Sequence, residues 1–388
     1  MTNNQNISQL PELAKLFLKL GTIGFGGPAA HIAMMEDEVV TRRGWLSRSQ
    51  FLDLVGATNL IPGPNSTEIV IHIGYIRAGW LGLIVAGVCF ILPAVLITGG
   101  FAWVYAVYGN LPQIAPLLYG IKPAILGVIF NAVWRLGKTA LKNRQLLIIA
   151  IAVSAAVFLG LNEVVALLGG GLLGIIWRHF SNHNGTGFGL FNLGFLVSTL
   201  PSSPSLPTPP SSPPLWQLGL FFLKVGSVLF GSGYVLVAFL EGGLVKEYGW
   251  LTQQQLLDAI AIGQFTPGPL LSTATFIGYL ISGLPGAIIA TVAIFLPSFL
   301  FVAALNPLLP RLRTSQWTAA FLDAVNVSSV ALMAVVLMKL SAATLTNLTS
   351  ILIGLIAAIL AIRYRLNATW LILGGGLIGC LFFWIMPN

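Results

Sequence analysis

The sequence predicts an all-α, polytopic membrane protein built from two inverted repeats, with about ten transmembrane helices in total. Of its 388 residues, 56% are hydrophobic and only 8% are charged, and the mean hydropathy is +0.89. A helix needs about 20 apolar residues to cross a bilayer, and only helices and closed barrels can cross one. The apolar runs, 79–107 among them, lack the alternation typical of barrel strands. The membrane-spanning segments are therefore expected to be helices.

A self-repeat is the second observation behind this fold. Matching segments recur at an offset of 205 residues: Gly44-Trp45-Leu46 with Gly249-Trp250-Leu251, and Pro62-Gly63-Pro64 with Pro267-Gly268-Pro269. The offset slips to 204 between Gly74-Tyr75 and Gly278-Tyr279. A repeat of this length indicates two homologous halves. In a membrane protein, broken helices at matching places of two halves are typical of a transporter with its site between them.

The chain divides into an N-terminal repeat (10–180), a linker (181–214) and a C-terminal repeat (215–388). Proline and serine are so dense in the linker that it cannot pack a core. The spans expected in the first half are 10–27, 80–108, 115–136, 145–161 and 163–178. Those expected in the second half are 216–232, 284–305, 317–340, 349–362 and 369–386.

Each half also contains a broken element, 51–76 or 256–280, with Pro-Gly-Pro in its middle. A proline removes a helical donor and clashes with the preceding turn, so two prolines around a glycine end one helix and begin another. The pattern predicts a re-entrant hairpin of two half-helices. A continuous, kinked helix is the alternative.

Positive charge swaps sides between equivalent loops, which predicts that the halves are inverted. One set lies in first-half loops: Arg42, Arg43, Arg48, Arg77, Lys138, Lys142, Arg144 and Arg178. The other set lies in second-half loops of the opposite kind: Arg311, Arg313, Arg363 and Arg365. Inverted halves bring both sets to the cytoplasm, where Lys and Arg concentrate, and place both termini outside it. The net charge of +8 is explained in this way, so no nucleic-acid partner is expected.

Lys19 and Lys224 occupy the same repeat position in the first helix of each half. A lysine inside an apolar span is costly and usually functional, so both are candidate ligands of an anionic substrate. The alternative is that each ammonium reaches the membrane interface on its flexible stem.

Glycine-rich segments follow both lysines. Glycine lets a ligand approach the backbone closely, and exposed N–H groups at helix starts bind anions. Helix starts are expected near Pro28, Asn65, Gly233 and Leu270, with their positive ends toward the substrate. The candidate substrate-binding residues of these segments are Gly24, Gly26, Gly27, Pro28, Pro62, Gly63, Pro64, Asn65, Gly231, Gly233, Pro267, Gly268 and Pro269. Close helix packing through small residues is the alternative.

Polar residues inside apolar spans complete the candidate site. Lys122 and its counterpart Asn326 are expected to face the substrate, whereas Arg135, which repeats as Lys339, is interpreted as a helix-end anchor. The repeated acids are candidates for coupling: Asp53 with Asp258, and Glu36 with Glu241. The first pair has an alternative role as caps or salt bridges at the membrane face.

No metal constellation is visible, because His31, His72, His179 and His183 have no ligand spacing with cysteines or acids. No nucleophile–base motif is visible either. The sequence therefore predicts neither an enzyme nor a cofactor.

Several segments together resemble the chromate ion transporter family in its long, two-domain form. They are Phe25-Gly26-Gly27-Pro28-Ala29-Ala30-His31-Ile32, Arg43-Gly44-Trp45-Leu46, Pro62-Gly63-Pro64-Asn65, Phe90-Ile91-Leu92-Pro93 and Gly120-Ile121-Lys122-Pro123-Ala124. The resemblance covers both halves and implies a multi-pass inner-membrane transporter best known for chromate efflux. A sulfate-like substrate remains an alternative, because both anions are tetrahedral dianions.

We therefore expect a secondary transporter of an inorganic oxyanion, working by alternating access between its halves within the lipid bilayer. The alternatives are an anion channel and, in another class, a membrane-embedded enzyme. Whether the chain pairs as a homodimer is left open.

Overall fold

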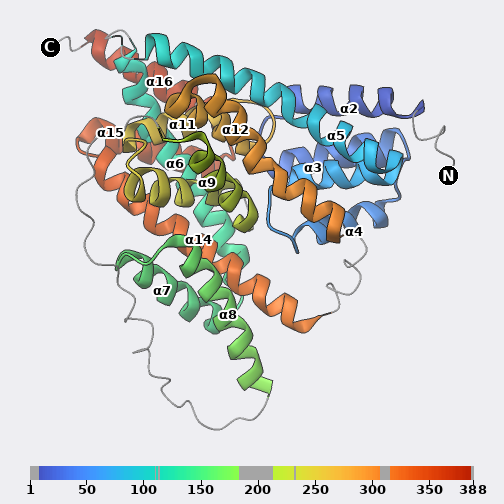
Figure 1. Ribbon diagram of the computed structural model, residues 1–388. Coiled ribbons are helices and arrows are strands. Elements are labelled where there is room, and N and C mark those ends of the chain that lie inside the picture. The colour runs from blue at the N-terminus through green and yellow to red at the C-terminus, as the bar shows by residue number, and fades with distance from the viewer. Residues whose placement is uncertain are drawn as a thin grey trace.

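The computed structural model describes residues 8–109, 111, 114–182, 213–230, 233–305 and 315–385, and this part of the chain forms helices and turns without strands (Figure 1). Most of the predicted linker, together with Gly231, Arg311 and Arg313, lies outside the described residues. The helices of the first half are α2 (Leu10–Ile23), α3 (Pro28–Glu36), the π-helix η1 (Asp37–Arg42), α4 (Arg48–Thr58), α5 (Asn65–Tyr108), α6 (Ala115–Ala140), α7 (Arg144–Phe158) and α8 (Glu163–Asn182).

The second half repeats this order. Its helices are α9 (Leu215–Val228), η3 (Gly233–Val235), α10 (Leu236–Leu240), the π-helix η4 (Glu241–Glu247), α11 (Gln253–Phe265), η5 (Leu270–Ser272), α12 (Thr273–Leu305), α14 (Gln316–Thr344), α15 (Leu348–Arg363) and α16 (Ala368–Ile385). Capping boxes begin α4, through Ser47 and Gln50, and α11, through Thr252 and Gln255. In each box two otherwise unpaired backbone donors are satisfied, so the same local chemistry starts both helices.

Within the described residues, five helical segments are long and apolar enough to cross a membrane. They are Asn65–Tyr108, Ala115–Ala140, Glu163–Phe180, Leu270–Ala304 and Gln316–Thr344. Four more helices are apolar but shorter: Arg144–Phe158, Leu215–Val228, Leu348–Arg363 and Ala368–Trp384. The all-α membrane fold is thus confirmed, whereas a count of ten spans stays a prediction.

Both Pro-Gly-Pro segments break the helix, as predicted. Helix α4 ends at Thr58 and α5 begins at Asn65, and in the second half α11 ends at Phe265 and η5 begins at Leu270. Because the chain leaves the helical conformation between them, a continuous kinked helix is excluded. Two half-helices therefore meet at each motif.

A second break lies inside α5 and α12, as expected from the sequence, where the broken elements end at 76 and 280 and the next spans begin at 80 and 284. Ala78 and Gly79 have non-helical dihedrals, with φ of +61° at Gly79, and Gly283 repeats this value in α12. The two arms of α5 then fold against each other so closely that a Cβ on Gly74 would overlap the carbonyl oxygen of Gly82. Glycine is required there because any side chain would separate the arms.

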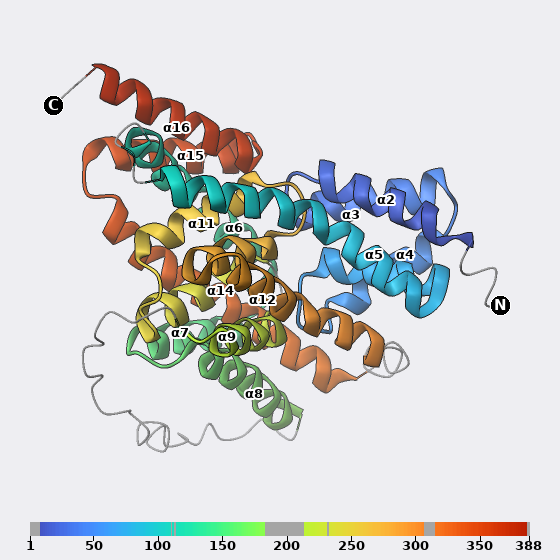
Figure 2. The same cartoon turned by 45° about the horizontal axis from the view of Figure 1, so that its top comes forward.

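The two halves exchange their last two helices. Helices α15 and α16 of the second half pack against α6 of the first, while α7 and α8 of the first pack against α14 of the second (Figures 1 and 2). The first-half α2 packs on its own α5, and α9 likewise packs on α12. The exchange buries a shared apolar core and joins the halves into one structure.

Equivalent long helices run in opposite directions. Gly87 of α5 faces Phe299 of α12, and four residues earlier Leu83 shares an apolar cluster with Val302. A step forward along α5 is therefore a step backward along α12. This antiparallel pairing is the arrangement expected of inverted repeats.

Each Pro-Gly-Pro segment is bonded to the glycine-rich loop of the other half. The Gly63 N–H donates to the Leu229 carbonyl oxygen at 2.7 Å, and the Gly268 N–H donates to the Gly24 carbonyl oxygen at 2.8 Å. Both donors and both acceptors are related by the same offset of 205 residues. This pair of bonds places the four loops at the junction between the halves.

The Gly268→Ala substitution tests this junction. Gly268 has φ of +95°, and a Cβ there would lie 2.8 Å from the Ala94 Cβ. Gly249→Ala is the matched control, because Gly249 has φ of +63° but nothing within 4 Å of the new carbon. A left-handed backbone costs each alanine about 1–2 kcal/mol, and overpacking should cost Gly268→Ala about 1–3 kcal/mol more. Equal thermal midpoints of the two variants in detergent would contradict close packing at Gly268.

Candidate functional site

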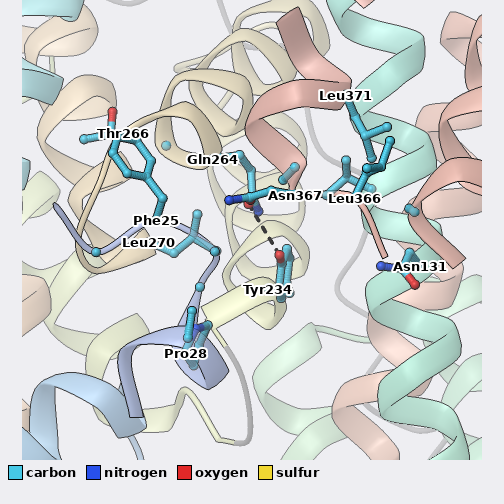
Figure 3. Close-up of a pocket in the computed structure, with 18 of the residues that line it drawn as sticks. Phe25, Pro28, Asn131, Tyr234, Gln264, Thr266, Leu270, Leu366, Asn367 and Leu371 are labelled. Carbon is cyan, nitrogen blue, oxygen red and sulfur yellow. Dashed lines mark hydrogen bonds between the residues drawn. The ribbon is translucent and has the colours of Figure 1, made fainter. Parts of the chain in front are cut away.

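A cavity of about 310 Å³ lies at the junction between the halves. The first half contributes the glycine-rich loop 24–28 and one face of α6. The second half contributes the end of α11, the segment around Gly268 and the turn from α15 to α16. Figure 3 shows Phe25 and Thr266 on one side, Asn131 of α6 on the other, and Tyr234 and Gln264 between them.

Two guanidinium groups make this cavity a candidate anion site. Arg135 and Arg365 line it, and both also line an adjoining cavity of about 320 Å³. No lining residue of either cavity is acidic, and neither arginine forms an ion pair with a carboxylate of the described residues. Among the described residues, Arg365 is the only residue other than glycine with a positive φ, at +52°. Strained backbone of this kind clusters at functional sites.

Three helical segments begin at the cavity. Pro28 starts α3, Leu270 starts η5, and Ala368 starts α16, and all three residues line the cavity. A helix N-terminus carries about half a positive elementary charge and unpaired N–H groups, which suit an anion. Gly26 and Gly27, with φ of +105° and +78°, keep side chains off the loop before α3.

Polar side chains without charge complete the lining. The Tyr234 hydroxyl donates to the Gln264 Oε1 atom at 3.4 Å. The Gln264 Nε2 atom is buried and has no hydrogen-bond partner in the described structure. A buried donor without a partner is costly, so an acceptor on a bound oxyanion would satisfy it.

The structure brings together only part of the set predicted from sequence. Lining the cavity are Gly24, Gly26, Gly27, Pro28 and Gly268. Not lining it are Lys19, Pro62, Gly63, Pro64, Asn65, Lys122, Lys224, Gly233, Pro267, Pro269 and Asn326. The four expected helix starts do exist at Pro28, Asn65, Gly233 and Leu270, but only the first and last face this cavity.

Lys19 has a protein partner, contrary to the expectation that a substrate would be its natural one. Its Nζ lies 2.7 Å from the Glu38 Oε1, and its side chain is 50% exposed. The hydrogen bond from Lys19 lowers the pKa of the Glu38 carboxyl, which lies outside the candidate spans. Lys224 is exposed on α9. The residue of the second half that is equivalent to Glu38 is Gly243 in η4, which has no carboxylate to offer. The two lysines thus share a repeat position but not an environment.

Lys122 and Asp258, predicted for separate roles, lie together. The Lys122 Nζ is 3.6 Å from the Asp258 Oδ1, and the Tyr105 hydroxyl donates to the Asp258 Oδ2 at 2.8 Å. The Asp258 side chain is 2% exposed and that of Lys122 is 17% exposed. This group joins α5 and α6 of the first half to α11 of the second, so the ammonium of Lys122 is already neutralised.

The remaining candidate coupling acids differ between the halves. Asp53 is exposed, whereas its repeat partner Asp258 is buried. Glu36 lies 3.3 Å from Arg48, and fully buried Glu241 lies 3.3 Å from the Lys246 Nζ. Repetition in the sequence therefore does not imply equal burial, and their role in coupling stays a prediction.

Arg135 corrects one interpretation of the sequence, because it lines the cavity rather than only anchoring a helix end. Its repetition as Lys339 was the available signal. Arg365 was assigned to a charged loop, and nothing near it in sequence indicates that the turn reaches α6. Asn131, Tyr234, Gln264 and Asn367 were missed because only the fold brings them together.

Comparison with known proteins gives a consistent family. The family model described as Chromate transporter matches residues 11–175 and again residues 216–380. The chromate transport protein of Cupriavidus metallidurans is 32% identical over 373 residues, covering 95% of this chain and 92% of the relative. The probable chromate transport protein of Synechococcus elongatus is 33% identical over 356 residues, with 90% and 89% covered.

The chromate transport protein of Pseudomonas aeruginosa is 31% identical over 392 residues, covering 97% of this chain and 93% of the relative. No solved structure matches the chain. Both halves match the same family model, and relatives of this similarity cover nearly the full length. The chain therefore belongs to the chromate transporter family.

Proposed function

We propose that this protein exports a divalent inorganic oxyanion, chromate in the first instance, across the inner membrane by alternating access. The observation that carries the proposal is the cavity between the halves, which has Arg135 and Arg365 in its lining and no carboxylate. The names of the relatives support chromate as the substrate.

The lining suits a tetrahedral dianion. Guanidinium groups bind oxyanions through paired N–H donors, and two of them match two negative charges. The N-termini of α3, η5 and α16 add partial positive charge, and the Gln264 amide adds a neutral donor. These groups recognise charge and oxygen geometry, which chromate shares with sulfate.

The charge pattern supports a cavity that faces the cytoplasm. Arg135 adjoins the first-half cluster at Lys138, and Arg365 belongs to the second-half set, both of which the positive-inside rule places in the cytoplasm. An inside-negative potential drives a dianion outward by about 2.3 kcal/mol per charge per 100 mV. Loading from the cytoplasm and release outside would therefore be favourable.

Uptake of radiolabelled chromate into inverted membrane vesicles tests the proposal. Vesicles that contain the protein should accumulate chromate when their interior is positive, and unlabelled sulfate should compete if the site reads only charge and shape. Vesicles from cells without the protein are the control. Uptake no faster than in the control, for both chromate and sulfate, would contradict oxyanion export.

A further inference from the structure

Glu68 is a buried carboxyl without a partner, at the Pro-Gly-Pro segment of the first half. It lies in the first turn of α5 and is 0% exposed. Neither carboxyl oxygen has a hydrogen-bond partner, and no lysine or arginine of the described residues forms an ion pair with it. A buried polar group without a partner requires an explanation.

The buried polar groups without partners on α5 and α12 also include those of three residues near this segment, which are His72, Thr67 and Ser298. His72, one turn along α5, is 0% exposed and both ring nitrogens lack partners, as does the hydroxyl of Thr67. Ser298 on α12 of the other half has a buried hydroxyl without a partner. A Cβ on Gly63 would overlap the Glu68 carboxyl and lie 2.7 Å from the Ser298 Oγ. Glu68 and Ser298 therefore flank the same point of the Gly63 loop, which is bonded to Leu229 of the other half.

The carboxylate form does not fit these surroundings. An ionised carboxyl removed from water is strongly unfavourable without a counter-ion. The helix N-terminus at Asn65 offers only about half a charge, which does not replace a full cation. A protonated carboxyl is neutral, so it suits a buried position that has no counter-ion.

Other ionisable groups on the elements packed against α5 do not supply the missing charge. Lys19 pairs with Glu38, Arg48 with Glu36, and Asp258 with Lys122. His31 on α3 contacts the Ser66 hydroxyl at 3.4 Å and the Gly24 carbonyl oxygen at 2.8 Å. No ion pair joins Glu68 to any of the other ionisable groups described on these elements. These groups are Glu12, Lys15, Asp53 and Tyr279 on the packed helices, and Tyr75, Arg77, Cys89, Tyr105 and Tyr108 on α5 itself.

The acid is not needed for the fold. Offsets of 204 and 205 place Ser272 and Thr273 at its position in the second half. The Thr98 hydroxyl donates to the Ser272 Oγ at 3.2 Å, and the Thr273 hydroxyl donates to the Leu270 carbonyl oxygen at 2.7 Å. The second half therefore forms the equivalent segment with satisfied hydroxyls and without a carboxyl.

We propose that Glu68, with His72 and Ser298 beside it, is a proton-binding site that couples oxyanion transport to proton movement. This inference rests on the proposed oxyanion transport. The proton is held while the Gly63 loop is closed on the other half. Ionisation of Glu68 requires the loop to open to water, so protonation and the conformational equilibrium are linked.

Transport in proteoliposomes tests this coupling, with the membrane potential clamped so that only the pH gradient acts. In the wild-type protein, one pH unit should change chromate accumulation by up to about tenfold per coupled proton, and reversing the gradient should reverse the change. Glu68→Gln should exchange chromate for chromate but ignore the pH gradient, and Glu68→Asp should restore part of the response. Glu12→Gln is the control, an exposed acid on α2 that should respond like the wild type.

Three results would overturn the proton site. One is an unchanged pH-gradient response in Glu68→Gln, and the second is a wild-type flux driven by a sodium gradient and not by pH. The third comes from infrared spectroscopy, which reports a protonated carboxylic acid directly: the wild type and Glu68→Gln would show the same carboxyl band. Because the infrared measurement needs no transport, it decides the proton site even if Glu68→Gln is inactive. Wild-type liposomes that move no oxyanion would instead contradict the proposed function alone.

Discussion

Replacing Arg135 with glutamine is expected to lower oxyanion transport about ten- to hundredfold. Arg135 lines both adjoining cavities, and no carboxylate of the described residues pairs with it. A hydrogen bond to a charged group contributes about 1.5–3 kcal/mol, and each 1.4 kcal/mol is about tenfold in affinity. The loss should appear mainly as a raised KM for chromate, because the guanidinium binds the anion before it moves.

A matched control separates the loss of a charge inside the cavity from the loss of a positive charge elsewhere on α6. Lys138 lies three residues further along α6 and is exposed, with its Nζ 4.6 Å from the centre of the Trp134 ring. Lys138→Gln removes the same charge from the same helix outside the cavity, and transport should stay near the wild-type value. Wild-type kinetics in Arg135→Gln, or equal losses in the two variants, would place the anion elsewhere.

Replacing Arg365 should also lower oxyanion transport, but the replacement must suit the left-handed backbone at this position. Its φ of +52° is tolerated better by asparagine than by most residues. Arg365→Asn should therefore remove the charge without destabilising the turn between α15 and α16. Transport should fall while the thermal midpoint is maintained.

The broken helices were predictable because their cause is local. Two prolines around Gly63 or Gly268 end a helix whatever surrounds them, and the repeat showed that the break occurs twice. The boundary at Ala78 and Gly79 was also predicted, between the broken element that ends at 76 and the span that begins at 80. The close approach of the two arms of α5 was not predicted, because it depends on Gly74 and Gly82, which meet only when the arms fold together.

The site was predicted where it follows from local sequence, in the loop 24–28 and at Gly268 of the second Pro-Gly-Pro segment. Gly24, Gly26, Gly27 and Pro28 were found because they form a contiguous glycine-rich segment. The two arginines were not, because the exchange of α15 and α16 onto α6 brings Arg365 beside Arg135. A repeat shows that positions are equivalent, but it does not show which half keeps the charge at the surface, as Asp53 and Asp258 illustrate.

Asp258→Asn is expected to destabilise the protein by about 3–5 kcal/mol. Its carboxylate neutralises Lys122 and accepts a hydrogen bond from Tyr105, and its side chain is 2% exposed. Removing one partner of a buried ion pair leaves the other charge uncompensated, which costs about this amount. Asp53→Asn changes the equivalent but exposed position of the first half, where surface substitutions stay within about 0.5 kcal/mol.

A double variant distinguishes the ion pair from a simple packing effect. The second half carries Asn326 where the first carries Lys122, so Lys122→Asn introduces a residue that this fold already contains at the equivalent position. Combined with Asp258→Asn, it removes both charges and should recover part of the stability lost in the single variant. The interaction energy of contacting residues is expected at about 0.5–3 kcal/mol, measured from denaturation midpoints in detergent. Strictly additive losses, or equal midpoints for Asp258→Asn and Asp53→Asn, would mean that Lys122 and Asp258 do not stabilise one another across the halves.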